Sequence, residues 1–338
     1  MMTLDQALAD KLLDDFDFSG LETVTEIEPK ALSRITRFGH RHLNFKSLPT
    51  LDLKVATILS KYNGSVSLDS LTELQASCAV QLGKQKGELS LNGIRSLDEN
   101  IAIHLSKHRK NDFFNNLFLN GLLKIDSATA DALSDFKGKL FLHGVEEPNP
   151  DVLNRIVSKS CSLSLKQIKS LPNTFCESLV GPKVKGSLYL DGVKQIDPLA
   201  ADSLTKVKGG VSLNGLVKIN SELAKSLAKI TNNLSLDGIK SLDGCTAFEL
   251  FKTKANLSLN GLKEIDSEVC EQLLNHFGSN KRRHQRIKLC GLKKISKDFA
   301  KKLAEKRNFE WRMSRRLRDK LPLSTVRKLE QRIPYPFK

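Results

Sequence analysis

A unit of 23 residues recurs through most of this 338-residue chain, and it constrains the fold more than any other sequence feature. The clearest units begin with an apolar-x-apolar stretch, turn at Asn-Gly or Asp-Gly, and continue into an amphipathic helix, as Val211–Asn233 does. Seven of the eleven intervals between successive units are 23 residues, and the other four are longer. The first apolar residues of the units are Phe16, Leu43, Val66, Leu89, Leu117, Leu140, Leu163, Leu188, Val211, Leu234, Leu257 and Ile287.

The order of residues inside one unit predicts a short strand, a tight turn and a helix. Leu257 and Leu259 alternate with Ser258 and Asn260, which is the period of a strand. Gly261 then marks a bend, where we expect a positive φ that glycine adopts without steric cost. A residue that can cap a helix N-terminus follows in most units, namely Asp98, Asp126, Asp197, Asn220, Asp243, Asp266 and Ser296.

One such unit cannot bury its own apolar side, so neighbouring units must stack to form a continuous core. We therefore predict an α/β solenoid of about twelve repeats, right-handed, with a parallel sheet on the concave face and short helices on the convex face. The expected organisation is an N-terminal capping helix at 1–15, the solenoid at 16–305, and a basic C-terminal helical cap or tail at 306–338.

This pattern resembles the leucine-rich-repeat superfamily, in a divergent bacterial-type form with a helix on the convex side. The resemblance covers about Phe16 to Leu303 and is carried by L-x-L pairs such as Leu89–Leu91, Leu188–Leu190 and Leu257–Leu259. It departs at the position of the family's ladder asparagine, three residues after the second strand leucine. That position holds an aliphatic residue here: Ile94, Leu122, Val193, Leu216 or Leu262.

Outward positions of the strands are mostly serine, so three aromatic residues among them indicate a protein-binding surface. The candidate protein-binding residues are Phe118, Asn120, Phe141, His143, Tyr189 and Asp191. The alternative is that a loop or the N-terminal helix covers the aromatic residues, or that they shield a thin part of the core. The preferred function is a non-enzymatic scaffold that presents this face to a protein partner.

Asparagine or aspartate recurs directly before the turn glycine of the repeats, as in Asn92, Asn214 and Asp237. This pattern has two interpretations. Asn-Gly and Asp-Gly favour the backbone conformations that leave a strand, which explains it by turn chemistry. The same side chains would also form a polar recognition stripe along the sheet.

The net charge of +16 arises in the last sixty residues, which contain 21 Lys and Arg and 5 Asp and Glu. Such density suits a polyanion, because lysine and arginine release counterions from phosphate backbones and a tryptophan can stack on a base. The candidate polyanion-binding residues are Lys281, Arg282, Arg283, Arg286, Trp311, Arg312, Arg315, Arg316 and Arg318. Nucleic acid or an acidic partner is the alternative function. An anionic membrane surface and a solvated capping helix are further explanations.

An EF-hand-like spacing near the N-terminus offers a calcium alternative. Its candidate ligands are Asp15, Asp17, Ser19 and Glu26, although the same stretch also fits a degenerate first repeat. The sequence contains no other metal cluster, no phosphate loop and no catalytic pair of carboxylates, so we expect no cofactor and no enzymatic activity.

Cysteine usage and the apolar stretches bear on the cellular setting. The six cysteines, Cys78, Cys161, Cys176, Cys245, Cys270 and Cys290, include no C-x-x-C pair, and we expect them to be reduced. Reduced cysteines predict a cytoplasmic protein. The N-terminus has no signal-peptide pattern, and no stretch approaches the ~20 apolar residues of a transmembrane segment.

Overall fold

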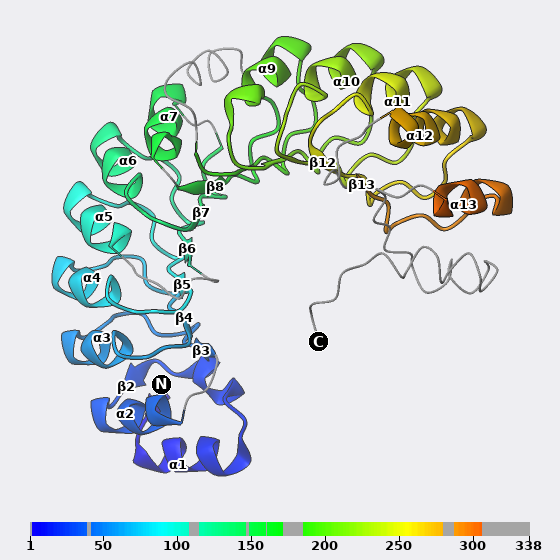
Figure 1. Cartoon of the computed structure of the whole chain (residues 1–338). Coiled ribbons are helices and arrows are strands. Elements are labelled where there is room, and N and C mark those ends of the chain that lie inside the picture. Colours follow the sequence, from blue (N-terminus) through cyan, green and yellow to red (C-terminus); the bar gives the residue numbers. More distant parts are fainter. Residues whose placement is uncertain are drawn as a thin grey trace. The chain divides into compact units, whose positions relative to one another are not determined.

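The computed structural model describes residues 2–38, 42–107, 115–146, 149–159, 161–171, 185–279 and 287–305. The chain divides into two units. Unit 1 comprises Met1–Gln167 and Val184–Gly186, and unit 2 comprises Ile168–Lys183 and Ser187–Lys338. In each unit, short strands alternate with helices, and the helices lie on one side of the strands (Figure 1).

Unit 1 contains a parallel sheet in which each strand pairs with the next strand along the sequence. Its strands are β3 (His42–Asn44), β4 (Ser65–Ser67), β5 (Leu89–Ser90), β6 (Asn116–Phe118), β7 (Lys139–Phe141) and β8 (Ser162–Ser164). The register pairs the predicted first residues of the repeats with one another, for example Leu117 with Leu140 and Leu140 with Leu163. The predicted period therefore equals one strand step in the sheet.

Unit 2 repeats this arrangement. Its strands are β9 (Leu188–Tyr189), β10 (Val211–Ser212), β11 (Asn233–Ser235), β12 (Asn256–Ser258) and β13 (Ile287–Lys288), again parallel and paired in chain order. Leu257 pairs with Leu234 on one side and with Ile287 on the other, so the long interval before Ile287 does not shift the register. An insertion in this repeat is tolerated because it lies outside the strand.

Each helix follows a strand. Unit 1 carries α3 (Leu53–Leu59), α4 (Ala76–Leu82), α5 (Glu99–Ser106), α6 (Ser127–Leu133) and α7 (Pro150–Ser158). Unit 2 carries α9 (Pro198–Ser203), η2 (Leu204–Lys206), α10 (Ser221–Leu227), α11 (Gly244–Leu250), α12 (Ser267–Ser279) and α13 (Lys297–Ala304). All seven predicted caps accept a main-chain N–H from the first turn of their helix at 2.7–3.1 Å. Each such bond satisfies one of the donors that a helix N-terminus leaves unpaired.

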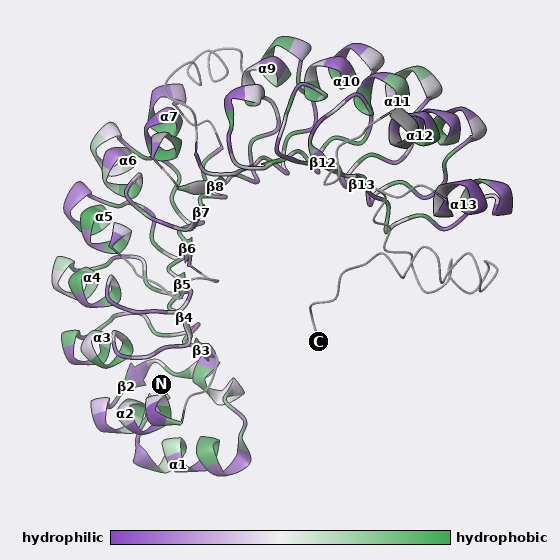
Figure 2. Ribbon diagram, in the orientation of Figure 1, coloured by the Kyte–Doolittle hydropathy of each residue, from purple (hydrophilic) through white to green (hydrophobic). Residues whose placement is uncertain are grey.

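The core of each unit combines the two inward positions of every strand with one side of each helix. The first positions in unit 1, such as Leu43 and Leu140, are at most 1% exposed, and so are the second positions, such as Leu119. In unit 2 the equivalent residues, such as Leu234 and Leu259, are at most 2% exposed. The helices show both hydrophilic and hydrophobic residues in Figure 2, because only one side of each is buried against the strands.

The N-terminal part of unit 1 departs from the predicted first repeat. It contains β1 (Thr3–Leu4), α1 (Gln6–Asp15), η1 (Ser19–Thr23), β2 (Glu26–Ile27) and α2 (Pro29–Arg37), and β1 pairs with β2. Phe16 does not begin a strand: it directly follows α1, is 79% exposed and has a φ of 50°. The assignment of Phe16 as the first strand residue was wrong, and β3 is the first strand of the regular series.

In most repeats a glycine follows the strand, and at Gly261 crowding requires it, whereas the expected positive φ was wrong. The φ of Gly261 lies outside the left-handed region. A Cβ at this position would lie 2.1 Å from the carbonyl oxygen of Asp237 and 2.5 Å from that of Ile239, both in the preceding repeat. Main-chain oxygens cannot move aside easily, so at Gly261 only glycine lets the two successive turns stack this closely.

Within each unit, the predicted α/β leucine-rich-repeat-like solenoid is confirmed by the parallel strands and by the helices on one side of them. The boundaries 1–15, 16–305 and 306–338 stay predictions.

Candidate functional site

Two aromatic rings lie side by side on the sheet face of unit 1. The register of β6 and β7 pairs Phe118 with Phe141, and their ring centroids are 4.2 Å apart with an interplanar angle of 19°. Both side chains are partly exposed. The neighbouring positions in the same row are Ser90 on β5 and Ser164 on β8, so the stacked pair stands between two small residues.

Polar groups surround the stacked pair. The Nζ of Lys139, on the same strand as Phe141, lies 4.7 Å from the centroid of the Phe141 ring. The His143 ring meets Phe141 edge-on, with centroids 5.6 Å apart, and its Nε2 lies 3.1 Å from the Oγ of Ser164. A cation above an aromatic face is attracted to it, typically by about 0.5–1 kcal/mol at an exposed site. The cluster therefore combines an apolar surface with a positive charge.

The candidate residues before glycine have a role that the sequence interpretation missed. The side-chain oxygen of Asn120 accepts the main-chain N–H of His143 at 3.1 Å, while its own N–H donates to the side-chain oxygen of Asn92 at the same distance. Asp69 continues this pattern by accepting the main-chain N–H of Asn92 at 3.0 Å. These residues form a hydrogen-bond ladder that links successive repeats.

Unit 2 contains a second ladder, in which aspartate and asparagine alternate. The side chain of each of Asp191, Asn214, Asp237 and Asn260 accepts the main-chain N–H of the next residue in the series, at 2.7–3.2 Å, and the series ends at Cys290. Serine hydroxyls of the sheet face donate to the same side chains, as Ser258 does to Asp237 at 2.7 Å. The recurrence of Asn or Asp at one repeat position was the sequence signal for this ladder.

Burial alone would raise the pKa of Asp69 in the ladder of unit 1. Hydrogen bonds from Ser90, Asn92 and Ser67 outweigh this effect and hold the pKa of the carboxyl below its ordinary value. Asp69 therefore remains a carboxylate under neutral conditions, and its negative charge strengthens the bonds that it accepts.

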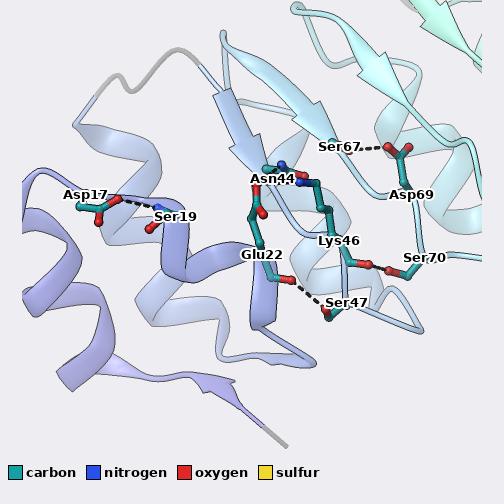
Figure 3. Close-up of polar contacts among 9 residues, drawn as sticks. All are labelled: Asp17, Ser19, Glu22, Asn44, Lys46, Ser47, Ser67, Asp69 and Ser70. Carbon is teal, nitrogen blue, oxygen red and sulfur yellow. Dashed lines mark hydrogen bonds and ion pairs between the residues drawn. The ribbon is translucent and has the colours of Figure 1, made fainter.

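Figure 3 shows how the ladder of unit 1 meets the N-terminal segment. Lys46 occupies the ladder position of the first regular repeat, and its Nζ pairs with Glu22 Oε1 at 2.9 Å. The same oxygen accepts a hydrogen bond from Asn44 Nδ2 at 2.7 Å, and the main-chain oxygen of Glu22 accepts one from Ser47. These contacts attach η1 to β3 and the turn that follows it.

The six candidate protein-binding residues are divided between the two units. Phe118, Asn120, Phe141 and His143 lie in unit 1 on adjacent strands or the turns after them. Tyr189 and Asp191 lie in unit 2, where Tyr189 is partly exposed and Asp191 accepts hydrogen bonds from Ser212 Oγ and the Asn214 main chain. The structure brings together Phe118, Phe141 and His143, and it engages the side-chain oxygens of Asn120 and Asp191 in the ladders.

The calcium candidates lie on three different elements of the N-terminal segment and on the loop between α1 and η1. Asp15 ends α1, Asp17 Oδ1 accepts the main-chain N–H of Ser19 at 2.9 Å, and Glu26 on β2 accepts from Thr3 Oγ1 at 3.2 Å. Across the described ranges, no group of three His, Cys, Asp or Glu side chains is placed to hold a metal ion. The calcium alternative gains no support from this arrangement.

The nine candidate polyanion-binding residues, from Lys281 to Arg318, lie outside the described residues. The described part of the basic region comprises β13 and α13. Lys288, Lys293, Lys297 and Lys301 are exposed there, and Lys302 pairs with Asp298 at 2.9 Å.

Five cysteines lie in the described part of the chain, and all five are free thiols. Burial raises the pKa of Cys161 to about 12 and that of Cys270 to about 11, which makes both thiols unreactive. A cytoplasmic location stays a prediction. None of the helices in the described ranges has the length and apolar character needed to span a bilayer.

A search of solved structures finds an internalin (inlF) from Listeria monocytogenes. The two chains are 13% identical, with 99% of this chain and 96% of the internalin covered and a TM-score of 0.40. No protein family model matches the sequence, and no curated protein matches it. At this TM-score the fold assignment rests on the strand registers and ladders of the chain itself.

Proposed function

We propose that this protein is a non-enzymatic scaffold that binds a protein partner through the sheet face of unit 1. The observation that carries the proposal is the stacked pair of Phe118 and Phe141 on a face whose neighbouring positions are serine. Partly exposed aromatic side chains with adjacent charged or polar groups are the usual centres of protein interfaces. Lys139 and His143 supply such groups here.

The ladder supports the same proposal, because it leaves the face rigid before any partner arrives. Side-chain oxygens of Asn92 and Asn120 are engaged with main-chain donors of the next repeat, so the strands that carry the two rings are tied together. A surface that is ordered in advance loses less conformational entropy on binding. The partner's contribution is expected to be an apolar or aromatic side chain that packs on the two rings, with a carboxylate near Lys139.

The test is affinity capture with the full chain and with a double variant, Phe118→Ala with Phe141→Ala, at moderate salt. The proposal expects a protein captured by the natural sequence to be lost from the double variant. The matched control is Phe16→Ala with Phe38→Ala, which removes two rings that are 79% and 64% exposed elsewhere in unit 1. The control should retain the protein.

Losing the stacked pair also removes about 0.5–1.5 kcal/mol of ring–ring interaction, so stability must be checked separately. A thermal melt shows whether the double variant remains folded, and Lys139→Glu provides a second variant that keeps both rings. Equal capture by the natural chain and by both of these variants would overturn the proposal.

A second candidate function is polyanion binding through residues 279–338, with nucleic acid or an acidic partner as the ligand. It is favoured by the concentration of the whole net charge in this region and by the exposed lysines of β13 and α13. Replacing Arg315, Arg316 and Arg318 with glutamine in the full chain should weaken binding to heparin and flatten its dependence on salt. Heparin binding that is insensitive to salt would exclude this candidate.

A further inference from the structure

One edge of unit 2 carries a lysine in every repeat. After each strand the chain places a buried aliphatic residue, such as Val193 or Leu262, and the next two residues are exposed. At least one of these two is a lysine in six successive repeats, and in the last repeat Lys294 directly follows Lys293. We name the set the lysine rim: Lys169, Lys194, Lys218, Lys240, Lys263 and Lys293.

Main-chain hydrogen bonds between neighbouring repeats set the spacing of the rim lysines. The N–H of Lys194 donates to the carbonyl oxygen of Lys169 at 2.8 Å, and the N–H of Lys293 donates to that of Lys263 at 2.8 Å. Lys240 likewise donates to Val217, the residue before Lys218, at 3.2 Å. Neighbouring rim positions are therefore separated by about one strand spacing, ~4.8 Å, and six of them span about 24 Å.

The repeat fold does not itself require a lysine at this edge. The equivalent positions in unit 1 hold Thr72 with Glu73, Arg95 with Ser96, Leu123 with Lys124, and Glu146, a mixture of charges and an apolar residue. In both units the same turn is followed by the same buried aliphatic position. The uniform charge of the lysine rim is therefore a property of the surface of unit 2.

Acidic groups near the rim neutralise only part of its charge. Lys294 pairs with Glu264 at 3.5 Å, and both side chains are strongly exposed, so this pair contributes little. The cap carboxylates Asp197, Asp243 and Asp266 follow the rim along the chain, and each accepts a main-chain N–H at its helix N-terminus. Their charges face the positive ends of those helix dipoles. The six rim lysines make no ion pair with another described residue.

We propose that the lysine rim binds the phosphate backbone of a single nucleic-acid strand without reading its bases. A line of point charges one residue wide fits a linear polyanion. Its length of about 24 Å matches roughly seven phosphates at a spacing of ~3.4 Å along a stacked strand. The rim holds no aromatic residue for base stacking and no arginine for base-edge recognition, so phosphate contacts alone are expected.

This inference shares the chemistry of the second candidate function and does not depend on the nine candidate residues between Lys281 and Arg318. It names a different binding surface, on described residues of unit 2. An acidic polypeptide and an anionic membrane are the competing ligands, and the experiment includes both.

The test is a fluorescence anisotropy titration of the full chain with labelled oligodeoxythymidylate about twenty nucleotides long, over a range of salt concentrations. The rim variant is Lys194→Gln with Lys240→Gln and Lys263→Gln. The control variant is Lys208→Gln with Lys225→Gln and Lys254→Gln, which removes the same charge from exposed lysines of unit 2 outside the rim. A third variant replaces Arg315, Arg316 and Arg318 with glutamine and keeps the rim.

If all six lysines contact phosphates, log K should fall with log salt concentration with a slope of about −4, since each contact contributes roughly −0.7 for a single strand. The rim variant should lose about two units of that slope and bind at least tenfold more weakly, while the control variant keeps at least half of the affinity. Equal losses in the rim and control variants would overturn the proposal. So would loss only in the arginine variant, or tighter binding to poly-glutamate or phosphatidylserine vesicles than to the oligonucleotide.

Discussion

The Oδ1 of Asp237 accepts the main-chain N–H of Asn260 at 2.7 Å, across the boundary between two successive repeats. The same carboxylate accepts the hydroxyl of Ser258 at 2.7 Å and the side-chain amide of Asn260 at 3.3 Å. One side chain thus satisfies a main-chain donor, a strand hydroxyl and an amide of the following repeat. The ladder contributes to stability because these donors are partly buried and would otherwise lose their partners.

Replacing Asp237 with alanine should destabilise unit 2. Hydrogen bonds to a charged group contribute about 1.5–3 kcal/mol, so we expect the free energy of unfolding to fall by about 2–3 kcal/mol. Urea denaturation followed by circular dichroism measures this change. Glu271→Ala, at an exposed position on α12, is the control and should change stability by less than about 0.5 kcal/mol. Similar losses for both variants would argue against a stabilising ladder.

The ladder also predicts a pH dependence through Asp69. Its folded-state pKa is lower than its value in the unfolded chain, about 3.9, because Ser90, Asn92 and Ser67 donate hydrogen bonds to the carboxylate. The resulting stability is fully present above the unfolded pKa and is lost as the pH falls through the folded pKa. Asp69→Asn should therefore be less stable than the natural chain at neutral pH, and the difference should shrink in acid. Guanidinium denaturation of both proteins at neutral and at acid pH measures the difference in their free energy of unfolding. A difference of the same size at the two pH values contradicts the prediction.

Aspartate and asparagine alternate along the ladder of unit 2, so no two neighbouring ladder positions carry a carboxylate. Asn214→Asp would place three carboxylates in a row, with Asp191 and Asp237 as neighbours. Repulsion between like charges at this spacing is worth about 1–3 kcal/mol and raises the pKa of the new carboxyl. The variant should be destabilised at neutral pH and should recover as the pH falls towards about 4. Asn233→Asp adds the same charge at an exposed strand position as a control, and equal destabilisation there would remove the argument.

Crowding at the turns gives a prediction that uses two glycines of the same unit. A Cβ at Gly261 would lie 2.1 Å from the Asp237 carbonyl oxygen, whereas the nearest atom to a Cβ at Gly210 is Asn233 Cβ at 3.2 Å. Gly261→Ala should lower the free energy of unfolding by more than about 2 kcal/mol, because main-chain atoms must shift. Gly210→Ala should change it by less than about 1 kcal/mol, since alanine also stiffens the unfolded chain. Thermal melts that rank the two variants in the opposite order would show the contact to be unimportant.

Strand positions were predictable from the sequence because the physical requirement behind them repeats. Every strand of the regular series must bury two apolar side chains in a stack, so leucine recurs at a fixed interval and residues such as Leu140 and Leu257 identify the register. The same reasoning failed at Phe16. The alternation of Phe16 and Phe18 resembles that of a strand, but Phe16 instead caps the C-terminus of α1 in a left-handed backbone conformation.

The polar part of the fold could be predicted less well. An asparagine before glycine fits a turn, and the neighbour that its side chain reaches in the next repeat is evident only once the register is known. Asn120 and Asp191 were therefore interpreted as surface groups, although their oxygens bond to the following repeat. The contact between Phe118 and Phe141 was easier to anticipate, since both occupy the same position in adjacent strands.

Because aspartate and asparagine alternate along the ladder of unit 2, removing an even number of repeats preserves the alternation and removing an odd number breaks it. Excising one repeat, Val211–Asn233, would bring Asp191 beside Asp237 and place two carboxylates at neighbouring ladder positions. Excising the pair Val211–Asn256 would instead leave Asp191 facing Asn260, with the charge pattern intact. Unit 2 should accordingly tolerate the loss of two repeats better than the loss of one. Selection would then act on the number of repeats as well as on their individual sequences.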